Sequence, residues 1–366
     1  MKALERSVED GRKQVARIVG RDTARLSADE IVRAGLMVKE AGMKANGFTP
    51  YLIMQANHSG RYSNPGNKPA PMIAYRHPIL EQYRAADDSC IVTDDYLKGL
   101  EEKFGEAAKL AKEAGFDAID IKSCHGYLLA ELASAYNRPG EYGGSFENRY
   151  RFPVEIVQAI KAACGPDFPV SLRYSVVSKT KGFRQGALPG EEYVEAGRDM
   201  AESERAAKYL QDAGYDCLNC DNGTYDAWYW AHPPIYMPEN CNLEDVEYIK
   251  QFCDIPVICA GRLDPRVAAD AIKDGKLDGA GFARQFLADQ EWVTKMMEDR
   301  EDDIRPCILC HNGCFNMCHY KGVPNDQELS DSLHLSRCAI NAETMQWNKH
   351  YIKKTNSPKT VHIVGG

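Results

Sequence analysis

The chain has 366 residues, of which 44% are hydrophobic and 27% are charged, and its formal net charge is −8. This composition is that of an ordinary globular protein, and the length favours one large α/β domain with an appended segment. The acidic balance, without clustered Lys and Arg, excludes a nucleic-acid-binding groove. No apolar run reaches the ~18 residues of a membrane span, and no basic-then-apolar leader follows Met1, so we expect a cytoplasmic protein without membrane contact.

Short apolar runs alternate with amphipathic helical stretches along the chain. The predicted strands cover residues 51–55, 118–122, 170–174, 217–220, 256–260 and 279–282. The predicted helices cover residues 27–45, 93–114, 146–164, 203–213, 244–252, 264–273 and 289–297. Strict alternation predicts a parallel sheet with right-handed crossovers, and its closed eight-fold form is the (β/α)₈ TIM barrel.

The two ends of the chain indicate a fragment. Residues 1–23 contain no convincing strand, which leaves the predicted barrel without its first two strands. Residues 359–366 read as a strand that enters a Gly-Gly turn, as at the start of a dinucleotide-binding unit. We therefore expect an N-terminally incomplete barrel at 1–300, an iron–sulfur segment at 301–350, and at 351–366 a linker with the first strand of a truncated Rossmann-like domain.

Four cysteines near the end have the spacing of a metal-cluster ligand set. Cys307, Cys310 and Cys314 stand on one short loop, and Cys338 follows later. Four thiolates in this arrangement suit a 4Fe-4S cluster, whereas zinc sites more often pair two Cys-x-x-Cys hairpins. The spacing favours the cluster, with zinc as the alternative and Cys318 as a rival ligand.

Motifs at the predicted strand ends resemble the old yellow enzyme family. They include Lys-Ser-Cys-His-Gly-Tyr at 122–127, Asn-Arg at 137–138 and Glu-Tyr-Gly-Gly-Ser-Phe-Glu-Asn-Arg at 141–149. Within that family, the branch of 2,4-dienoyl-CoA reductase and its NADH:flavin oxidoreductase relatives is the most similar. The resemblance runs from about Gln55 to Cys338. It implies an FMN-binding TIM barrel, a 4Fe-4S cluster after the barrel, and FAD and NAD(P)H sites in the full-length protein.

The resemblance assigns FMN contacts to six residues. Gln55 and Arg173 look like the residues that address the pyrimidine side of the flavin, where a fixed cation stabilises the reduced ring. The pairs Gly261-Arg262 and Ala283-Arg284 resemble the phosphate grip. Glycine allows close approach of the backbone, and arginine is expected to meet the phosphate with two parallel hydrogen bonds.

The resemblance also implies catalytic roles for three residues. Tyr127 is similar to the proton donor of the family, and His125 to an anchor that holds a substrate oxygen. Lys122 departs from the histidine that many members have at the first anchor position. Its ammonium is suited to an enolate-like oxygen or a carboxylate. An aromatic loop at 225–234, with His232 as a polar contact, is expected to cover the flavin.

The resemblance favours Cys338 over Cys318 as fourth ligand, because Cys-Ala-Ile-Asn resembles the family's fourth-ligand segment. The sequence therefore predicts an oxidoreductase that transfers hydride between FMN and a carbonyl-conjugated C=C bond, with electrons relayed through the cluster. The expected partners are an enone or enoyl thioester, NAD(P)H and, as an allowed state, a second copy of the chain. The alternatives are a non-catalytic electron-transfer subunit and a Schiff-base aldolase that uses Lys122.

Overall fold

The structure is a computed structural model that describes residues 38–44, 47–65, 68–82, 86–318, 337–344 and 355–362. Its contacts divide the chain into two compact units, Met1–Gly281 and Phe282–Gly366. Residues 38–44 are helical, as expected for that part of the predicted helix at 27–45. Residues 1–37, which include the first part of that predicted helix, and the terminal Gly-Gly turn lie outside the described residues. Within residues 355–362, the structure assigns no strand.

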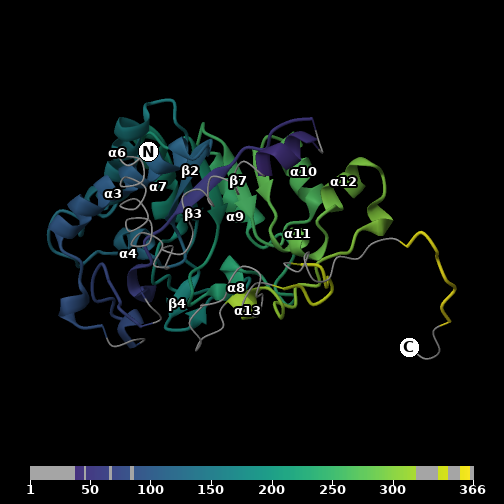
Figure 1. Cartoon of the computed structure of the whole chain (residues 1–366). Coiled ribbons are helices and arrows are strands. Elements are labelled where there is room, and N and C mark those ends of the chain that lie inside the picture. Colours follow the sequence, from purple (N-terminus) through teal and green to yellow (C-terminus); the bar gives the residue numbers. More distant parts are fainter. Residues whose placement is uncertain are drawn as a thin grey trace. The chain divides into compact units, whose positions relative to one another are not determined.

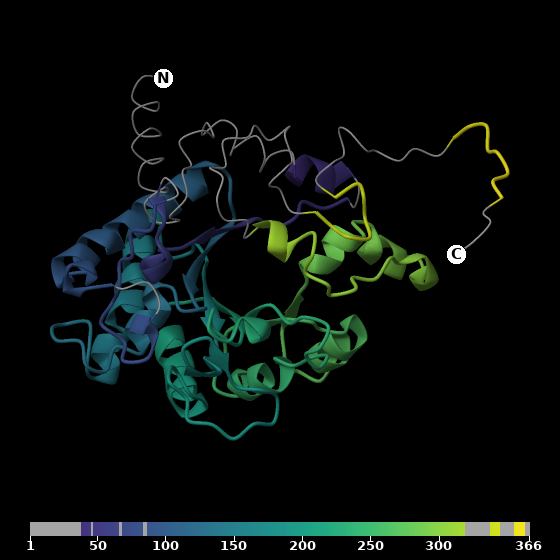
Figure 2. The same cartoon turned by 90° about the horizontal axis from the view of Figure 1, so that it is seen from below.

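The first unit is built around a six-stranded parallel sheet (Figures 1 and 2). Neighbours in the sheet follow the order β1-β2-β3-β6-β7-β8. The strands are β1 (Ile53–Ala56), β2 (Ala118–Ser123), β3 (Val170–Ser175), β6 (Cys217–Asp221), β7 (Val257–Ala260) and β8 (Gly279–Gly281). Each predicted strand is thus confirmed, and the order is that of consecutive right-handed units in a barrel-type sheet. A small antiparallel pair, β4 (Thr180–Gly182) and β5 (Gln185–Gly186), was not predicted.

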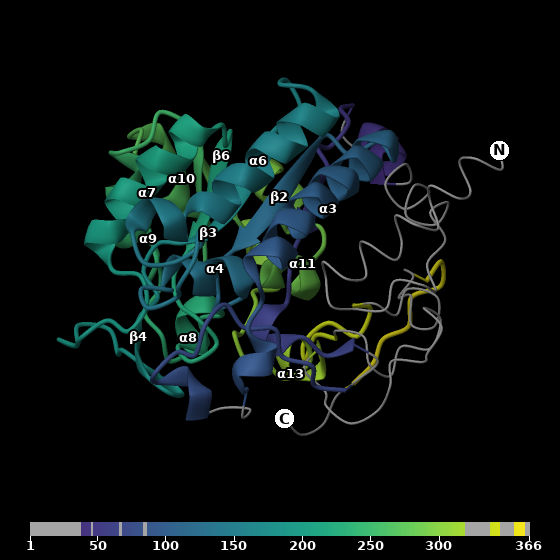
Figure 3. The same ribbon diagram turned by 90° about the vertical axis from the view of Figure 1, so that its left-hand side faces the viewer.

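Helices connect the strands and cover one side of the sheet. In the first unit they are α3 (Asp94–Glu113), α4 (Leu128–Ala133), α5 (Phe146–Arg149), α6 (Arg151–Cys164), α7 (Met200–Ala213), α8 (Trp228–Ala231), α9 (Leu243–Lys250) and α10 (Pro265–Lys273). Figure 3 shows α3 and α6 side by side over β2. Helices α3 and α10 begin at side-chain caps: Thr93 accepts from the amide of Tyr96, and Asp264 caps α10 ahead of Pro265.

The predicted helix at 146–164 is divided at Tyr150, which ends α5 and precedes α6. Pro153 explains the division, because proline lacks an amide hydrogen and is tolerated in the first turn of a new helix but not in a helix interior. In the second unit, the short helices α11 (Arg284–Ala288), α12 (Trp292–Met297) and α13 (Phe315–Cys318) are described. Only α12 among these three was predicted.

The two faces of the sheet differ in polarity because side chains alternate along each strand. Ile119, Ile121, Leu172 and Leu218 are fully buried, and Tyr174, on the same face as Leu172, donates to the backbone of Ser203 in α7. This face is therefore the helix-covered core. The alternate residues form the polar face of the sheet: Asp120, Lys122, Ser171, Arg173, Asn219 and Asp221.

Among the described helices, none combines the length and apolar character needed to cross a bilayer.

Candidate functional site

Gln55 and Asp120 begin the polar face of the sheet. Their Cα atoms are register partners across β1 and β2, and Gln55 Nε2 donates to Asp120 Oδ2 at 2.7 Å. Ser171 of β3 donates to the other carboxylate oxygen. Burial raises the pKa of Asp120, and these two hydrogen bonds oppose that rise. The buried Asp120 thus fixes the carboxamide of Gln55 by a hydrogen bond, while Gln55 itself is exposed and stays accessible.

Arg173 occupies the centre of the polar face. Its register partners are Lys122 on β2 and Asn219 on β6, so the three side chains lie at one level of the sheet. Arg173 Nη1 donates to Asn219 Oδ1 at 2.6 Å, and Nη2 donates to the Asp221 carboxylate. Burial by itself lowers the pKa of Arg173, but the attraction of Asp221 outweighs it and raises that pKa. The guanidinium is thus a fixed cation.

His125 lies in the loop after β2 and also contacts Asp221. Its Nε2 is 2.8 Å from Asp221 Oδ2, and the ring is almost completely buried. Burial alone lowers the pKa of His125, but the carboxylate raises it to about 9 overall. Burial acts to raise the pKa of Asp221, whereas Arg173 and His125 lower it to about 2. At neutral pH the group is therefore a carboxylate between two cations.

The backbone at His125 is unusual. Its φ of 60° lies in the left-handed region, which is uncommon for residues other than glycine. Gly126 follows with φ 77°, and this turn brings Tyr127 to the start of α4. Backbone conformations of this kind persist where surrounding contacts fix them, and they occur often at functional sites.

Tyr127 lies in a group of three tyrosines. Its hydroxyl is 2.5 Å from the hydroxyl of Tyr225, and its ring packs edge-on against Tyr62 at 5.7 Å between centroids. Lys122 Nζ lies 4.5 Å from the centroid of the Tyr127 ring. The structure thus brings the predicted residues Lys122 and Tyr127 together, and adds Tyr225 to them.

The aromatic loop after β6 divides its side chains between two environments. Tyr225 reaches Tyr127, and the ring of His232 lies 5.7 Å from that of His125. Trp230 instead packs in a small core with Ala227 and Met237 and donates through Nε1 to a backbone carbonyl. Trp230 is therefore structural, and the cover of the flavin by this loop stays a prediction.

Gly261 and Arg262 follow β7. A Cβ atom on Gly261, whose φ is 118°, would lie 2.3 Å from Asn242 Nδ2, so glycine is required there. Arg262 has a φ of 48°. Its Nη1 donates to the carbonyls of three loop residues: Pro234, Ile235 and Met237. The guanidinium is thus engaged in holding this loop, and a bidentate phosphate contact by Arg262 stays a prediction.

In the second unit, Ala283 precedes α11 and Arg284 begins it. Arg284 Nη1 lies 2.6 Å from His311 Nε2. Burial, with a smaller contribution from Arg284, lowers the pKa of His311 to about 4. Because His311 lies between Cys310 and Cys314, the predicted arginine is connected to the cysteine loop.

The four predicted ligand cysteines line one pocket of the second unit, together with Arg284, Leu287, Ile308, His311, Gly313 and Ala339. Leu309 and His311 have φ values of 55° and 58°, so the loop between the cysteines is tightly wound. At Gly313 a Cβ atom would come within 2.9 Å of the backbone of Arg337, which lies next to Cys338. The Cys318 side chain lies outside the described part.

Sequence reasoning did not identify four residues of the site: Asp120, Ser171, Asn219 and Asp221. The first three alternate with apolar residues inside predicted strands, as in Ile-Asp-Ile-Lys at 119–122, and Asp221 directly follows the predicted strand at 217–220. Strict alternation signals a strand with one polar face, so it could have found them. Tyr225 was predicted as part of the aromatic loop, but its contact with Tyr127 was not.

Cys124, His125 and Asp221 place one potential metal-ligand atom each within 4.8 Å of one another. Asp221 already accepts hydrogen bonds from two cationic side chains. A metal cation would have to compete with Arg173 and His125 for the same carboxylate, so this group is better described as part of the charge network than as a metal site.

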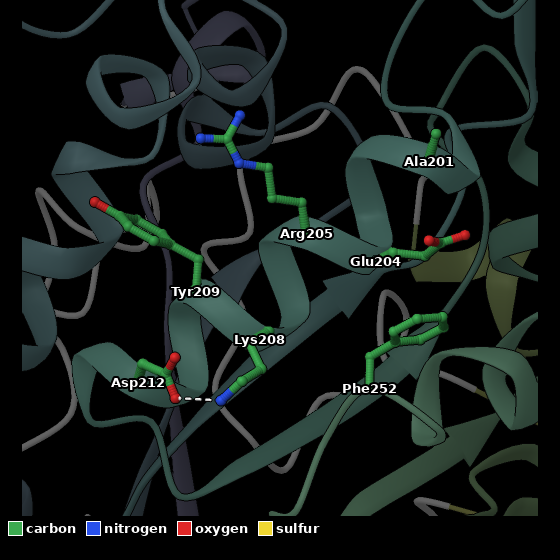
Figure 4. Close-up of a pocket in the computed structure, with 7 residues that line it drawn as sticks. All are labelled: Ala201, Glu204, Arg205, Lys208, Tyr209, Asp212 and Phe252. Atoms are coloured by element: carbon green, nitrogen blue, oxygen red, sulfur yellow. Dashed lines mark hydrogen bonds and ion pairs between the residues drawn. The ribbon is translucent and has the colours of Figure 1, made fainter.

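A separate hollow lies on the helix-covered side of the sheet (Figure 4). It is lined by Ala201, Glu204, Arg205, Lys208, Tyr209, Asp212 and Phe252, mostly from α7. Lys208 and Asp212 form an exposed ion pair across one helical turn at 2.8 Å. The hollow is shallow and solvated and contains none of the polar-face residues.

The sequence matches the family model described as NADH:flavin oxidoreductase / NADH oxidase over residues 51–303. It is 44% identical over 279 residues to a cinnamate reductase of Clostridium sporogenes, covering 75% of this chain and 40% of that protein. It is 31% identical over 319 residues to an NADH oxidase of Thermoanaerobacter brockii, covering 86% of this chain and 45% of that protein. The chain thus spans less than half the length of these relatives.

Solved structures show the same fold. A 2-naphthoyl-CoA reductase complex superimposes with a TM-score of 0.70 at 21% identity, over 93% of this chain and 49% of that one. An old yellow enzyme homologue from Zymomonas mobilis gives 0.54 at 20% identity, over 75% of this chain and 72% of that one. The predicted barrel-type α/β fold and the resemblance to the old yellow enzyme family are confirmed, and the chain belongs to the NADH:flavin oxidoreductase / NADH oxidase family.

Proposed function

We propose that this chain is the reductase part of an FMN-dependent enzyme that saturates a C=C bond conjugated to a carbonyl or carboxyl group. The observation that carries the proposal is the polar face of the sheet. It combines a fixed cation for a flavin, Arg173, with cationic His125 and with Tyr127, a phenol beside Lys122. In a barrel-type sheet, functional groups gather at the carboxyl ends of the strands, and these groups are at those ends.

The residues fit FMN. Gln55 and Arg173 are each anchored from behind by buried or half-buried partners, so they would present an amide and a cation to the pyrimidine side of the ring. Gly261 allows close approach of the backbone for a phosphate, with Arg262, Ala283 and Arg284 as the further proposed contacts. When bound, FMN supplies the hydride that is added to one alkene carbon.

Tyr127 would supply the proton for the other alkene carbon. A phenol hydroxyl held within reach of the reacting carbon is a competent general acid. The hydroxyl of Tyr225, 2.5 Å away, is placed to orient the Tyr127 hydroxyl and to return a proton to it. The reaction adds one hydride and one proton to the two carbons of one C=C bond and leaves a saturated C–C bond.

Lys122 and His125 would bind the oxygen of the activating group. Negative charge grows on that oxygen as hydride adds to the conjugated carbon, and nearby cationic donors stabilise it. A free carboxylate would meet the same two groups, and cinnamate is the acid named for the relative that is 44% identical. We therefore propose aryl-substituted 2-enoic acids as first substrates to test, with enones and enoyl thioesters as the broader class.

The aldolase alternative loses support from the position of Lys122. Schiff-base formation needs a neutral amine. The face of the Tyr127 ring, 4.5 Å from Nζ, stabilises the ammonium form instead.

The four cysteines support a 4Fe-4S cluster more than zinc. Cys307, Cys310 and Cys314 stand on one short loop, Cys338 follows later, and all four line one pocket of the second unit. Zinc sites more often pair two Cys-x-x-Cys hairpins, so this arrangement suits the cluster better.

The electron donor belongs to the proposal for the whole protein. We propose that NAD(P)H reduces FAD in a further domain and that the cluster relays the electrons to FMN. The single test is reconstitution of the full-length protein with FMN, iron and sulfide under anaerobic conditions, followed by single turnover with dithionite. Conversion of cinnamate or an enone to its saturated product supports the function, and absence of turnover with a flavin-loaded protein overturns it.

A further inference from the structure

The buried carboxylate of Asp221 joins two parts of the proposed site. Asp221 ends β6 and is fully buried. Its Oδ2 accepts from His125 Nε2 at 2.8 Å and from Arg173 Nη2, and its Oδ1 accepts from Ser175 Oγ at 3.3 Å. One acidic group is thus bonded to two cations that come from two different strand units.

Titratable and charged groups from several segments surround this carboxylate. The second strand unit contributes His125 and the Cys124 thiol, β3 contributes Arg173, and the segment after α8 contributes His232, whose charge also acts on Asp221. The ring of Tyr225 lies 6.4 Å from that of His125. Asp221 is the carboxylate that directly bonds the imidazole in this group.

The second ring nitrogen of His125, Nδ1, does not bond Asp221. Nδ1 is buried and, among the described residues, has no partner that meets the geometry of a hydrogen bond. The neighbouring Cys124 thiol interacts with the ring and, like Asp221, raises the pKa of His125. Buried polar atoms are normally paired, so an unpaired one points to a ligand that the atom would bind. The bond from Nε2 to Asp221 at 2.8 Å fixes the orientation of the ring.

We propose that Asp221 is a positioning residue that keeps His125 as an imidazolium, so that Nδ1–H donates to the oxygen of the substrate's activating group, while the same carboxylate fixes Arg173 beside the flavin. This inference rests on the proposed reductase function. Asp221 does not touch substrate; it acts through His125. A charged donor makes a stronger hydrogen bond to a developing oxyanion than a neutral one.

The first test reads the protonation of His125 without using activity. The full chain, labelled with ¹⁵N-histidine, is titrated by NMR, and the His125→Asn variant identifies the signal. We expect His125 to carry protons on both nitrogens at pH 7 and to titrate near pH 9. A neutral His125 at pH 7 in the wild-type chain overturns the proposal, even if no variant folds.

The second test removes the charge of Asp221. In Asp221→Asn the His125 signal should titrate at or below its ordinary value near 6.5, because burial then acts without the opposing carboxylate. The alkaline limb of kcat/KM should move by about 2.5 pH units or more, which at pH 8 is a loss of at least about 30-fold through the protonated fraction of His125. An unmoved limb overturns the proposal.

Asp216→Asn is the matched control. Asp216 directly precedes the same strand, pairs with Lys161 at 2.6 Å and accepts from the amide of Val170, at the opposite end of β6. It should leave both the His125 titration and the alkaline limb unchanged. In the His125→Asn background, Asp221→Asn should produce no further shift of the limb, and a further shift would contradict action through His125.

The two proposals fail in different ways. A flavin-loaded protein that reduces no conjugated acid, enone or thioester, but whose His125 titrates near pH 9, counts against the reductase function alone. An active reductase whose His125 is neutral at pH 7 counts against the role of Asp221 alone.

Discussion

The ammonium of Lys122 lies 4.5 Å from the centroid of the Tyr127 ring. The two residues come from β2 and from the start of α4, and the turn through His125 and Gly126 brings them together. This contact places the proposed proton donor and a proposed oxygen-binding cation on one small patch. Their contributions can be separated by substitution, because one acts on proton transfer and the other on charge.

Tyr127→Phe should lower kcat for the reduction by about 10²- to 10⁴-fold, the range of a lost general acid, while the flavin spectrum stays unchanged. Phenylalanine keeps the ring packed against Tyr62 and removes only the hydroxyl. Steady-state kinetics with anaerobic product analysis is the measurement. Tyr225→Phe is the comparison variant and should have the smaller effect, because Tyr225 only orients the donor. Equal effects would mean that Tyr127 and Tyr225 act together in the proton transfer.

Lys122→Met should raise KM for a carboxylate substrate more than for a neutral enone. Methionine keeps length and apolar volume but removes the charge, so the discrimination between the two substrates measures the ammonium. We expect the ratio of kcat/KM values, acid over enone, to fall at least tenfold. The ratio should stay unchanged in Lys208→Met, whose ammonium pairs with Asp212 on the outer surface of α7. An unchanged ratio in Lys122→Met would contradict the proposed contact between Lys122 and the substrate carboxylate.

The strands and long helices could be predicted because their signals are local. Apolar runs such as 170–174 and caps such as Thr93 are written in consecutive residues. Pro153 is likewise a local sign of the division at Tyr150, because it lies in the first turn of α6.

No local sequence signal predicts which residues of the site are bonded to one another. Asp221 and His125 are 96 residues apart, and the other bonded partners on the polar face are separated by 46 to 65 residues, so only the register of neighbouring strands brings them together. Single residues such as Arg173 and Tyr127 could be named from a family resemblance. What each bonds to depends on the tertiary fold, which is why Arg262 proved to hold a loop.

Cys338→Ser should lower the iron content and remove most of the broad absorbance near 400 nm, because serine is a poor cluster ligand. Cys318→Ser is the matched variant and should leave about four irons per chain. Iron and acid-labile sulfide are assayed on anaerobically purified full-length protein. The reverse result, with iron lost only in Cys318→Ser, would exchange the fourth ligand. One zinc per chain in place of iron would contradict the cluster.

Between pH 6.5 and 9, the stability difference between wild type and Asp221→Asn should shrink as the pH rises. The pKa of His125 is about 9 in the folded chain, against an ordinary 6.5, so its contribution is fully present below 6.5 and is lost as the pH passes through about 9. The pKa of Asp221, about 2, acts in the other direction, and its contribution is lost only as the pH falls below about 4 towards 2. Urea unfolding at pH 5, 7 and 9.5 measures the difference.

Arg61→Met should destabilise the fold by about 3–5 kcal/mol, because it leaves a buried acid without its partner. Arg61 is 1% exposed, and its Nη2 bonds Glu131 at 2.5 Å and Glu81 at 2.9 Å. Arg205→Met is the control: Arg205 also pairs with a glutamate, Glu147, but both side chains are more than half exposed, so the loss should stay below about 1 kcal/mol. Chemical denaturation of both variants gives the two values. Equal losses would mean that burial does not govern the strength of these ion pairs. A large loss confined to Arg61→Met would show that the bond from Arg61 to Glu131 fixes the segment after β1 to α4, the helix that begins beside Tyr127.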